Sequence, residues 1–213
     1  MNTRNNEFKF VFITVGHTAA GKSTLAQALC KKLDIVYISA GDIKRSFVKN
    51  YSAKNSLDPL LLDKGYTGAT MKSIEALKEH ESVLIDATFF QKHRRVAIES
   101  EIRKNYEKTI IIWLYCDCPN YEKVVNRIKK RSEMPENVGN QADNVEVYNH
   151  ILNNFDILNI ENFSKDTIII SIDTQHNRIK KVESNFNFVS INKKLLLSVF
   201  AFIETYLENK RNE

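Results

Sequence analysis

Residues that interrupt regular structure are scarce in this chain of 213 residues, which contains only three prolines and six glycines. The scarcity predicts a chain made mostly of helices and strands that are joined by short connections. No internal repeat or low-complexity tract stands out in the sequence. Three of the glycines, Gly16, Gly21 and Gly41, fall in the segments where the candidate site residues gather, so their placement is informative.

Cysteine is also rare, with three residues at Cys30, Cys116 and Cys118. The last two are separated by one residue, and no histidine or second cysteine pair lies nearby, so a zinc site is not expected. Cys30 falls on the apolar face of an expected helix and Cys116 at the end of an expected strand. These positions are typical of reduced core thiols in a cytosolic protein.

Long apolar segments are missing as well. Residues 1–7 lack the apolar stretch and cleavage site of a signal peptide. The longest apolar run near the other end, residues 195–203, is interrupted by Ser198 and is too short to cross a bilayer. We therefore expect a soluble, cytoplasmic protein with no membrane partner and no obligate protein partner.

Charge is only mildly unbalanced, because 31 lysines and arginines face 26 acidic residues, giving a net charge of +5. The isoelectric point near 9.0 is compatible with a polyanionic partner but does not identify one. A hydrophobic content of 43% is enough for a sizeable core, and the length suits one domain. We expect residues 1–213 to form a single domain.

The most specific pattern lies at residues 16–23, GHTAAGKS, which match the phosphate-binding P-loop pattern G-x-x-x-x-G-K-S. An apolar run at residues 10–15 precedes it, and a stretch with helical apolar spacing follows it. Backbone N–H groups and the positive end of the helix dipole would converge on an anion there. We expect Lys22 to reach the β- and γ-phosphates and the Ser23 hydroxyl to ligate Mg²⁺. A glycine turn that precedes lysine and serine by chance is the alternative.

Apolar and amphipathic segments alternate along the rest of the chain. Strands are expected at residues 10–15, 34–39, 82–86, 108–116 and 166–173. Helices are expected after the P-loop and at residues 41–50, 67–80, 91–105, 119–131, 145–154 and 193–209. This order predicts an α/β fold, a P-loop NTPase three-layer sandwich with a five-stranded parallel sheet and helices on both faces.

Three segments do not fit this alternation plainly. Residues 51–66 contain Pro59 and an apolar triplet, and they indicate an irregular or partly helical excursion. The polar residues 132–143 separate two expected helices, which is where a small lid over a nucleotide site could lie. Residues 176–188 are compatible with more than one structure.

Two acidic positions could take part in chemistry. Asp86 ends the third expected strand, where an acid of a P-loop protein holds Mg²⁺; a helix cap or turn residue is the alternative. Asp42 and Arg45 share one helical face after the second strand. Asp42 could accept the proton of an attacking hydroxyl and Arg45 could hold a phosphate. A first-turn aspartate beside a solvent-facing arginine is the competing interpretation.

Basic residues cluster at two further places. Arg127 and Arg131 lie four apart on the helix that leads into the expected lid, where an arginine could stabilise the charge of a transferring phosphoryl group. Cations at a solvated helix end are the alternative. Residues 92–95, KHRR, could bind the phosphate of an acceptor or lie on the surface.

These pieces together resemble the P-loop kinases of the polynucleotide 5′-hydroxyl kinase type, which are related to zeta-toxin and gluconate kinases. The matching segments are residues 16–24, the D-x-x-R pattern at residues 42–45, the strand with D-x-T and two arginines at residues 84–95, and V-x-R-x-x-x-R at residues 125–131. Their order agrees over roughly residues 9–175. Phe89 and Phe90 depart from the family pattern, which has a small polar residue after the threonine. These aromatic residues could stack a base or pack against a different acceptor.

The resemblance implies a set of roles. Lys22, Asp42, Arg45 and Arg131 would be catalytic, with Asp42 as general base, Arg45 on the acceptor and Arg131 as the lid arginine on the β- and γ-phosphates. Ser23 and Asp86 would hold Mg²⁺. The residues expected to bind ATP are Gly16, His17, Thr18, Ala19, Ala20, Gly21, Lys22, Ser23, Thr24 and Arg127. Within the loop, the His17 side chain is expected to fill space rather than to catalyse.

The leading hypothesis is transfer of the ATP γ-phosphoryl group to an acceptor hydroxyl, with Mg²⁺ as cofactor and an RNA or DNA 5′-hydroxyl end as acceptor. A nucleoside, sugar or antibiotic is the alternative, as is the nucleotide-sugar of a zeta-toxin-like kinase. A nucleotide-switched interaction protein such as a GTPase is less favoured, because no N-K-x-D motif is present and residues 191–194 break it.

Overall fold

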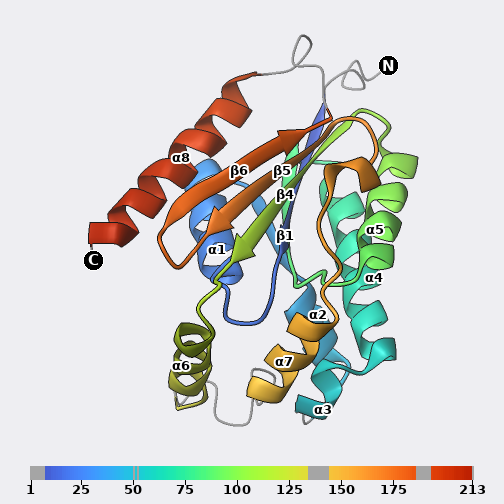
Figure 1. Ribbon diagram of the computed structural model, residues 1–213. Coiled ribbons are helices and arrows are strands. Elements are labelled where there is room, and N and C mark those ends of the chain that lie inside the picture. The colour runs from blue at the N-terminus through green and yellow to red at the C-terminus, as the bar shows by residue number, and fades with distance from the viewer. Residues whose placement is uncertain (1–7, 50, 52, 134–143, 186–192, 213) are drawn as a thin grey trace, which may run out of the picture.

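The computed structural model describes residues 8–49, 51, 53–133, 144–185 and 193–212 (Figure 1). Within them, six strands form one sheet in the spatial order β2-β3-β1-β4-β5-β6. The pairs from β2 to β5 are parallel, and β6 pairs antiparallel with β5. The strand β1 is therefore central, and the carboxyl ends of β1, β2 and β3 meet at the same edge of the sheet.

The strands are β1 (Lys9–Val15), β2 (Val36–Ser39), β3 (Ser82–Asp86), β4 (Thr109–Asp117), β5 (Thr167–Asp173) and β6 (Arg178–Ser184). The helices are α1 (Lys22–Leu33), α2 (Ala40–Ser46), α3 (Ala53–Ser56), α4 (Pro59–Ala76), α5 (Lys92–Asn105), α6 (Tyr121–Ser132), α7 (Val145–Asn153) and α8 (Lys193–Asn212), with a 3₁₀ turn, η2, at Ile160–Asn162.

Helices cover both faces of the sheet, which confirms the predicted three-layer α/β architecture (Figure 1). The helices α1 and α8 pack on one face through side chains that include Leu29 and Val199. On the other face, α4, α5 and α7 contribute Ala69, Ile98 and Val147 to a second core cluster. Each strand of the sheet interior therefore needs apolar side chains on both of its faces.

The strand β1 illustrates this demand. Its side chains alternate between the two clusters, with Val11 and Ile13 on one face and Phe10 and Phe12 on the other. Burying each such side chain contributes roughly 1.5–3 kcal/mol. The continuous apolar run that marked this strand in the sequence is thus a direct result of its central place.

The sixth strand corrects the expectation of five parallel strands. It lies within residues 176–188, which the sequence left open, and it returns after the connection 174–177. A connection this short permits an antiparallel hairpin but not the crossover that a parallel strand requires. Arg178, Lys180 and Lys181 are exposed along this edge strand. Because charged residues interrupt it, the strand lacks the apolar run that identified the others.

The helix α4 also differs from its predicted bounds, because it begins at Pro59 rather than at residue 67 and ends at Ala76 rather than at residue 80. The Asp58 carboxylate accepts hydrogen bonds from the N–H groups of Leu60 and Leu61, and proline occupies the first turn. This cap and this proline are favourable helix-starting signals. Most of the segment expected to be irregular or partly helical is therefore helical.

Smaller differences concern the segment around α6. Pro119 does not open this helix, because Asn120 is the N-cap and the helix starts at Tyr121. The lid expected at residues 132–143 lies outside the described residues, apart from Ser132 and Glu133 at the end of α6. Among the described residues, no helix combines the length and the hydropathy that crossing a bilayer requires.

Candidate active site

The P-loop follows β1 and opens α1, as the sequence predicts. Gly16 has a φ of +138°, and a Cβ atom at this position would lie 2.2 Å from the carbonyl oxygen of Cys116 on β4. Gly21 is the N-cap of α1 and has a φ of +88°. The first glycine is required for the close approach to β4, and the second for the left-handed backbone conformation.

The start of α1 lacks the groups that usually satisfy a helix N-terminus. Gly21 offers no side-chain cap, and the first turn contains no acidic residue. The first-turn N–H groups of a helix have no intrahelical acceptors, and they carry the positive end of the helix dipole. A phosphate oxygen held by the loop would supply the acceptors and the negative charge.

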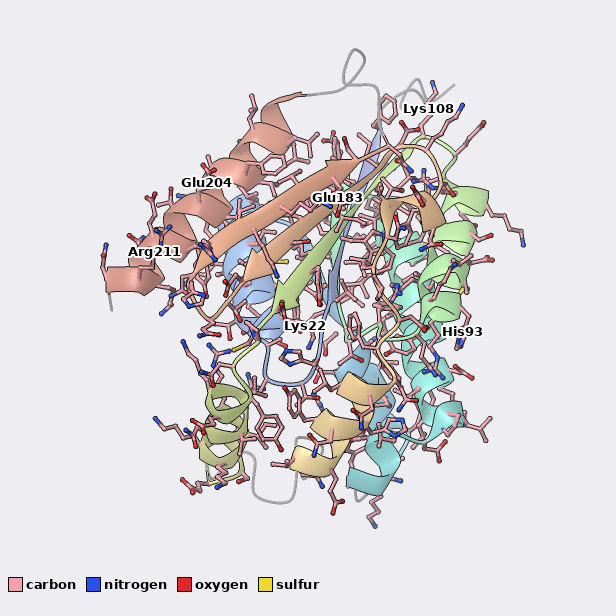
Figure 2. All side chains as sticks on the ribbon, in the orientation of Figure 1. Lys22, His93, Lys108, Glu183, Glu204 and Arg211 are labelled. Atoms are coloured by element: carbon pink, nitrogen blue, oxygen red, sulfur yellow. The ribbon has the colours of Figure 1, made fainter. Side chains whose placement is uncertain are left out.

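Lys22 lies inside this loop. Its side chain is 8% exposed and its Nζ donates a hydrogen bond to the carbonyl oxygen of His17 at 2.7 Å. Figure 2 shows the residue at the edge of the sheet toward which the arrow of β4 points. Ser23 follows it and is exposed at the cavity wall. Both residues therefore line the same cavity.

The His17 ring is occupied by contacts within the protein. Its Nδ1 lies 2.9 Å from the Thr18 carbonyl oxygen, and its Nε2 accepts a hydrogen bond from the Cys118 N–H group at 3.4 Å. Because a carbonyl oxygen only accepts, Nδ1 is the donor in the first of these contacts. The ring also makes an edge contact with Tyr148 of α7, with the centroids 5.1 Å apart. The His17 side chain thus packs between the P-loop and α7, which is sufficient to explain why a ring occupies this position.

Asp86 is held in a fixed orientation at the end of β3. Its Oδ1 accepts a hydrogen bond from the Thr14 hydroxyl at 2.8 Å, and its Oδ2 accepts one from the Tyr37 hydroxyl at 2.7 Å. The carboxylate is only 6% exposed, yet it lines the same cavity as Lys22 and Ser23. Burial, followed by the charge of Asp86, raises the pKa of Tyr37 well above its usual value, so the phenol remains a donor.

One cavity of about 340 Å³ joins these groups to the helices on the far side. Its nucleotide end is lined by Thr18, Ala19, Lys22, Ser23, Gln27, Tyr37 and Asp86. Its other end, formed by α2, α3, α4 and α7 and the loop after β3, is lined by Asp42, Lys44, Arg45, Tyr51, Leu57, Leu62, Tyr66, Phe90, Val147 and Ile151, among others. We call these two groups the nucleotide end and the acceptor end, after the roles that the sequence predicts for their residues.

Asp42 and Arg45 sit at this acceptor end and form an ion pair on α2. The Asp42 side chain is 67% exposed, and its backbone N–H donates to the Ser39 hydroxyl, which caps the helix. Because α2 begins directly after β2, at Ala40, the Asp42 carboxylate lies at the carboxyl edge of the sheet and lines the same cavity as Asp86. The sequence placed these residues on one helical face, and the structure brings both to the cavity.

Arg127 and Arg131 have different surroundings, although they lie one turn apart on α6. Arg127 donates hydrogen bonds to the carbonyl oxygens of Ala19 at 3.1 Å and Thr174 at 3.3 Å, so it joins the P-loop to the β5–β6 turn. It is absent from the described lining of the cavity, whereas Arg131 lines it. The geometry therefore separates a residue that supports the loop from one that faces the cavity.

Arg94 and Arg95 are both buried. For these two positions, the expectation that residues 92–95 bind an acceptor phosphate or lie on the surface was therefore wrong. Arg94 pairs with Asp63 at 2.9 Å and lies over the Tyr66 ring. Arg95 is 1% exposed and donates to the carbonyl oxygens of Phe89 and Asp156. Burial lowers the pKa of Arg95, but its carbonyl partners satisfy part of the charge. By contrast, Figure 2 shows His93 on the outer side of α5.

Phe89 and Phe90 pack inside the protein. Phe89 is fully buried, stacks on Tyr66 with centroids 4.5 Å apart and contacts Trp113, so it is not available to stack a base. Phe90 is 2% exposed and forms part of the cavity wall. Tyr51 and Tyr66 line the cavity although no motif marked them. The position of Tyr66 on α4 could have been inferred only if the helix start at Pro59 had been recognised.

Comparison with known families decides the classification. The model of family AAA_33, described as an AAA domain, matches residues 11–149, which is more than half of the chain. The chain belongs to this family. The matched part of the AAA domain includes the P-loop, α2, β3 and α6, and it therefore contains the nucleotide end and much of the acceptor end. No curated protein matches the chain.

Solved structures share the fold of this AAA domain protein at low sequence identity. A candidate kinase from Chloroflexus aurantiacus J-10-fl is 17% identical, with a TM-score of 0.63, and the match covers 79% of this chain and 89% of that chain. A fungal RNA kinase is 13% identical, with a TM-score of 0.57 and coverage of 95% and 86%. A sugar kinase from Janibacter sp. HTCC2649 is 14% identical, with a TM-score of 0.54 and coverage of 77% and 85%. The chain thus has the P-loop fold that these kinases share.

Proposed function

We propose that this protein is a Mg²⁺-dependent kinase that transfers the γ-phosphoryl group of ATP to an acceptor hydroxyl. The observation that carries the proposal is that two carboxylates of different character, Asp86 and Asp42, line one cavity with the P-loop lysine. Phosphoryl transfer needs little covalent chemistry, so positioning and charge stabilisation supply most of the rate. The site offers both.

The nucleotide end fits a triphosphate and a divalent cation. The uncapped start of α1 and the Lys22 ammonium would hold the β- and γ-phosphates. Ser23 would ligate Mg²⁺, and Asp86 would bind it directly or through water, because hydroxyl and carboxylate oxygens are the ligands this ion prefers. When bound, Mg²⁺ neutralises charge on the phosphate oxygens. Thr14 and Tyr37 keep the Asp86 carboxylate oriented for this role.

The acceptor end fits the activation of a hydroxyl. Asp42 is exposed at the cavity and would accept the proton as the hydroxyl oxygen attacks the γ-phosphorus. Arg45, paired with Asp42, would hold a phosphate of the acceptor, and Arg131 would stabilise the charge on the transferring group. In this reaction the bond from the γ-phosphorus to the bridging oxygen breaks, and ADP leaves with that oxygen.

The lining of the acceptor end favours a 5′-hydroxyl end of RNA or DNA. Leu57, Leu62 and Ile151 provide apolar surface for a base, and the cations Lys44 and Arg45 suit a phosphodiester. A nucleoside is the second candidate, because it carries the same base and 5′-hydroxyl group as the end of an oligonucleotide.

A comparison of acceptors tests this proposal. The protein is incubated with MgATP and, separately, 5′-hydroxyl oligonucleotides, nucleosides, sugars and aminoglycosides, and phosphorylated product is measured. Asp42→Asn should lower kcat by about 10²- to 10⁴-fold while the dissociation constant for ATP changes by less than about twofold. Glu75→Gln, an exposed change on α4, is the matched control. ATP binding without transfer to any acceptor would contradict the assignment as a kinase.

A further inference from the structure

Two glycines inside α4 face α2 at close range. A Cβ atom on Gly65 would lie 3.0 Å from the Ala40 carbonyl oxygen and 3.1 Å from the Lys44 Cβ. A Cβ atom on Gly68 would lie 2.7 Å from the Ile43 Cγ2. A Cβ contact of 2.7 Å is essentially absent from real proteins, and contacts of 3.0 and 3.1 Å are tighter than most, so an alanine at either position requires atoms of α2 to shift. We call this contact the glycine seam.

Helix propensity gives no reason for these glycines, because glycine is among the least favourable residues in a helix interior. Gly65 is buried and Gly68 is partly buried, each on the side of α4 that meets α2. The exposed Thr67, which lies between them, points away from the seam. The glycines are therefore explained by the close packing of α2 against α4, and not by the stability of α4 itself.

The helix α2 is only seven residues long, yet it carries Asp42, Lys44 and Arg45 into the acceptor end. Its first residue, Ala40, follows Ser39 of β2 directly and is buried in the core cluster. The Ser39 hydroxyl caps the helix, and Lys44 donates from Nζ to the Ser56 carbonyl oxygen and lies over the Tyr51 ring. The start of α2 is therefore fixed by β2, whereas the side that carries Ile43 and Lys44 rests on α4. The P-loop, by contrast, is carried by β1 and α1.

We infer that Gly65 and Gly68 are positioning residues, which set the depth of α2 and through it the place of Asp42 relative to the γ-phosphate. The kinetic part of this inference rests on the proposed function. A misplacement of about 1 Å in a reacting group can cost about 10²-fold in rate. The seam therefore controls transfer to the acceptor while the nucleotide end keeps its geometry.

The test compares five variants of the full chain. Gly68→Ala should lower kcat/KM for the acceptor about tenfold or more, with the dissociation constant for ATP within about twofold of the original. Removing the contacting atom with Ile43→Ala should restore most of this loss in the double variant, because the nearest remaining atom is the Ile43 Cβ at 4.0 Å. Gly65→Ala meets the backbone oxygen of Ala40, so Ile43→Ala should not rescue it. Thr67→Ala is the matched control and should leave the kinetics unchanged.

A crystal structure of the Gly68→Ala protein separates the two proposals. Displacement of α2 with an unchanged P-loop supports the seam, even if the original protein phosphorylates no acceptor and the proposed function fails. An undisplaced α2, unchanged acceptor kinetics in an active kinase, or equal losses in ATP binding and transfer would overturn the inference. If Gly68→Ala does not fold, the double variant should fold. Its failure to do so would show that Ile43 is not the limiting contact and would also overturn the inference.

Discussion

The nucleotide end and the acceptor end of the cavity are built in different ways. At the nucleotide end, Lys22 and Asp86 are less than a tenth exposed. Lys22 donates to the His17 carbonyl oxygen of the P-loop, and Asp86 accepts from Thr14 on β1 and Tyr37 on β2. At the acceptor end, Asp42 is 67% exposed and sits on a short helix. In the proposed kinase, the groups that would hold phosphate and Mg²⁺ lie on the P-loop and the central strands, whereas the acceptor end is a separate helical layer that could vary while the chemistry stays the same.

The largest expected effect comes from removing the charge of Asp86 while keeping the shape of its side chain, which tests whether the two ends of the cavity act separately. Asp86→Asn should lower phosphoryl transfer by about 10²-fold or more and raise the Mg²⁺ concentration needed for half-maximal rate. The acceptor KM should change little, because Asp86 belongs to the nucleotide end. Kinetics over a range of Mg²⁺ concentrations measure both quantities.

Asp34→Asn is the matched control for this change, because Asp34 is exposed after α1 in a left-handed conformation that asparagine tolerates. It should behave like the original protein. A rise in the acceptor KM as large as the fall in kcat of Asp86→Asn would show that the two ends do not act separately.

A second experiment compares the roles of the two arginines of α6 in activity and in stability. Arg131→Ala should lower kcat about tenfold or more, because this residue faces the cavity. Arg127→Ala should instead lower the free energy of unfolding by about 1–3 kcal/mol, and so the thermal midpoint by several degrees. The reason is that the Ala19 and Thr174 carbonyl oxygens lose their donor. Calorimetry and steady-state kinetics on both variants check the division, and the reverse pattern would contradict it.

The smallest expected effect is on the free energy of unfolding at alkaline pH, and it concerns Cys30 on α1. Burial raises the pKa of the Cys30 thiol to about 12, from an ordinary value of 9.0. The folded protein therefore holds this proton more tightly than the unfolded chain does. The resulting stabilisation is complete below pH 9 and is lost as the pH rises from 9 toward 12.

Cys30→Ala should remove this contribution, so the free energy of unfolding should fall less steeply with pH, by about 1.4 kcal/mol per pH unit between pH 9.5 and 11. Urea denaturation at several pH values gives the slope. Below pH 8 the two proteins should have the same pH dependence. An unchanged slope above pH 9 would show that the thiol is accessible to solvent in the folded protein.

The nucleotide end could be predicted from the sequence because its determinants are local. The P-loop needs glycine at particular backbone positions, and Gly16 and Gly21 meet those requirements in the structure. Asp86 was expected at the end of an apolar strand, and β3 ends there. In each case the position of the residue relative to its strand or helix was enough to predict where it lies.

The acceptor end was less predictable because its determinants are distant in sequence. Tyr66 reaches the cavity only through the packing of α4, and Arg94 is buried only because Asp63 and Tyr66 lie beside it. A run of four basic or polar residues gives no sign of such partners. Likewise β6 is defined by its pairing with β5, and its own residues resemble a solvated segment.

The hairpin formed by β5 and β6 has a consequence for how short the chain can be made. The family match ends at residue 149, before either strand begins. Without β6, the isoleucines of β5 would border a bare row of backbone N–H and C=O groups, which invites other chains to add to the sheet. Lysines on β6 and the cover of α8 discourage such aggregation. A shortened protein that stops after β5 should therefore precipitate even though it keeps every residue that lines the cavity.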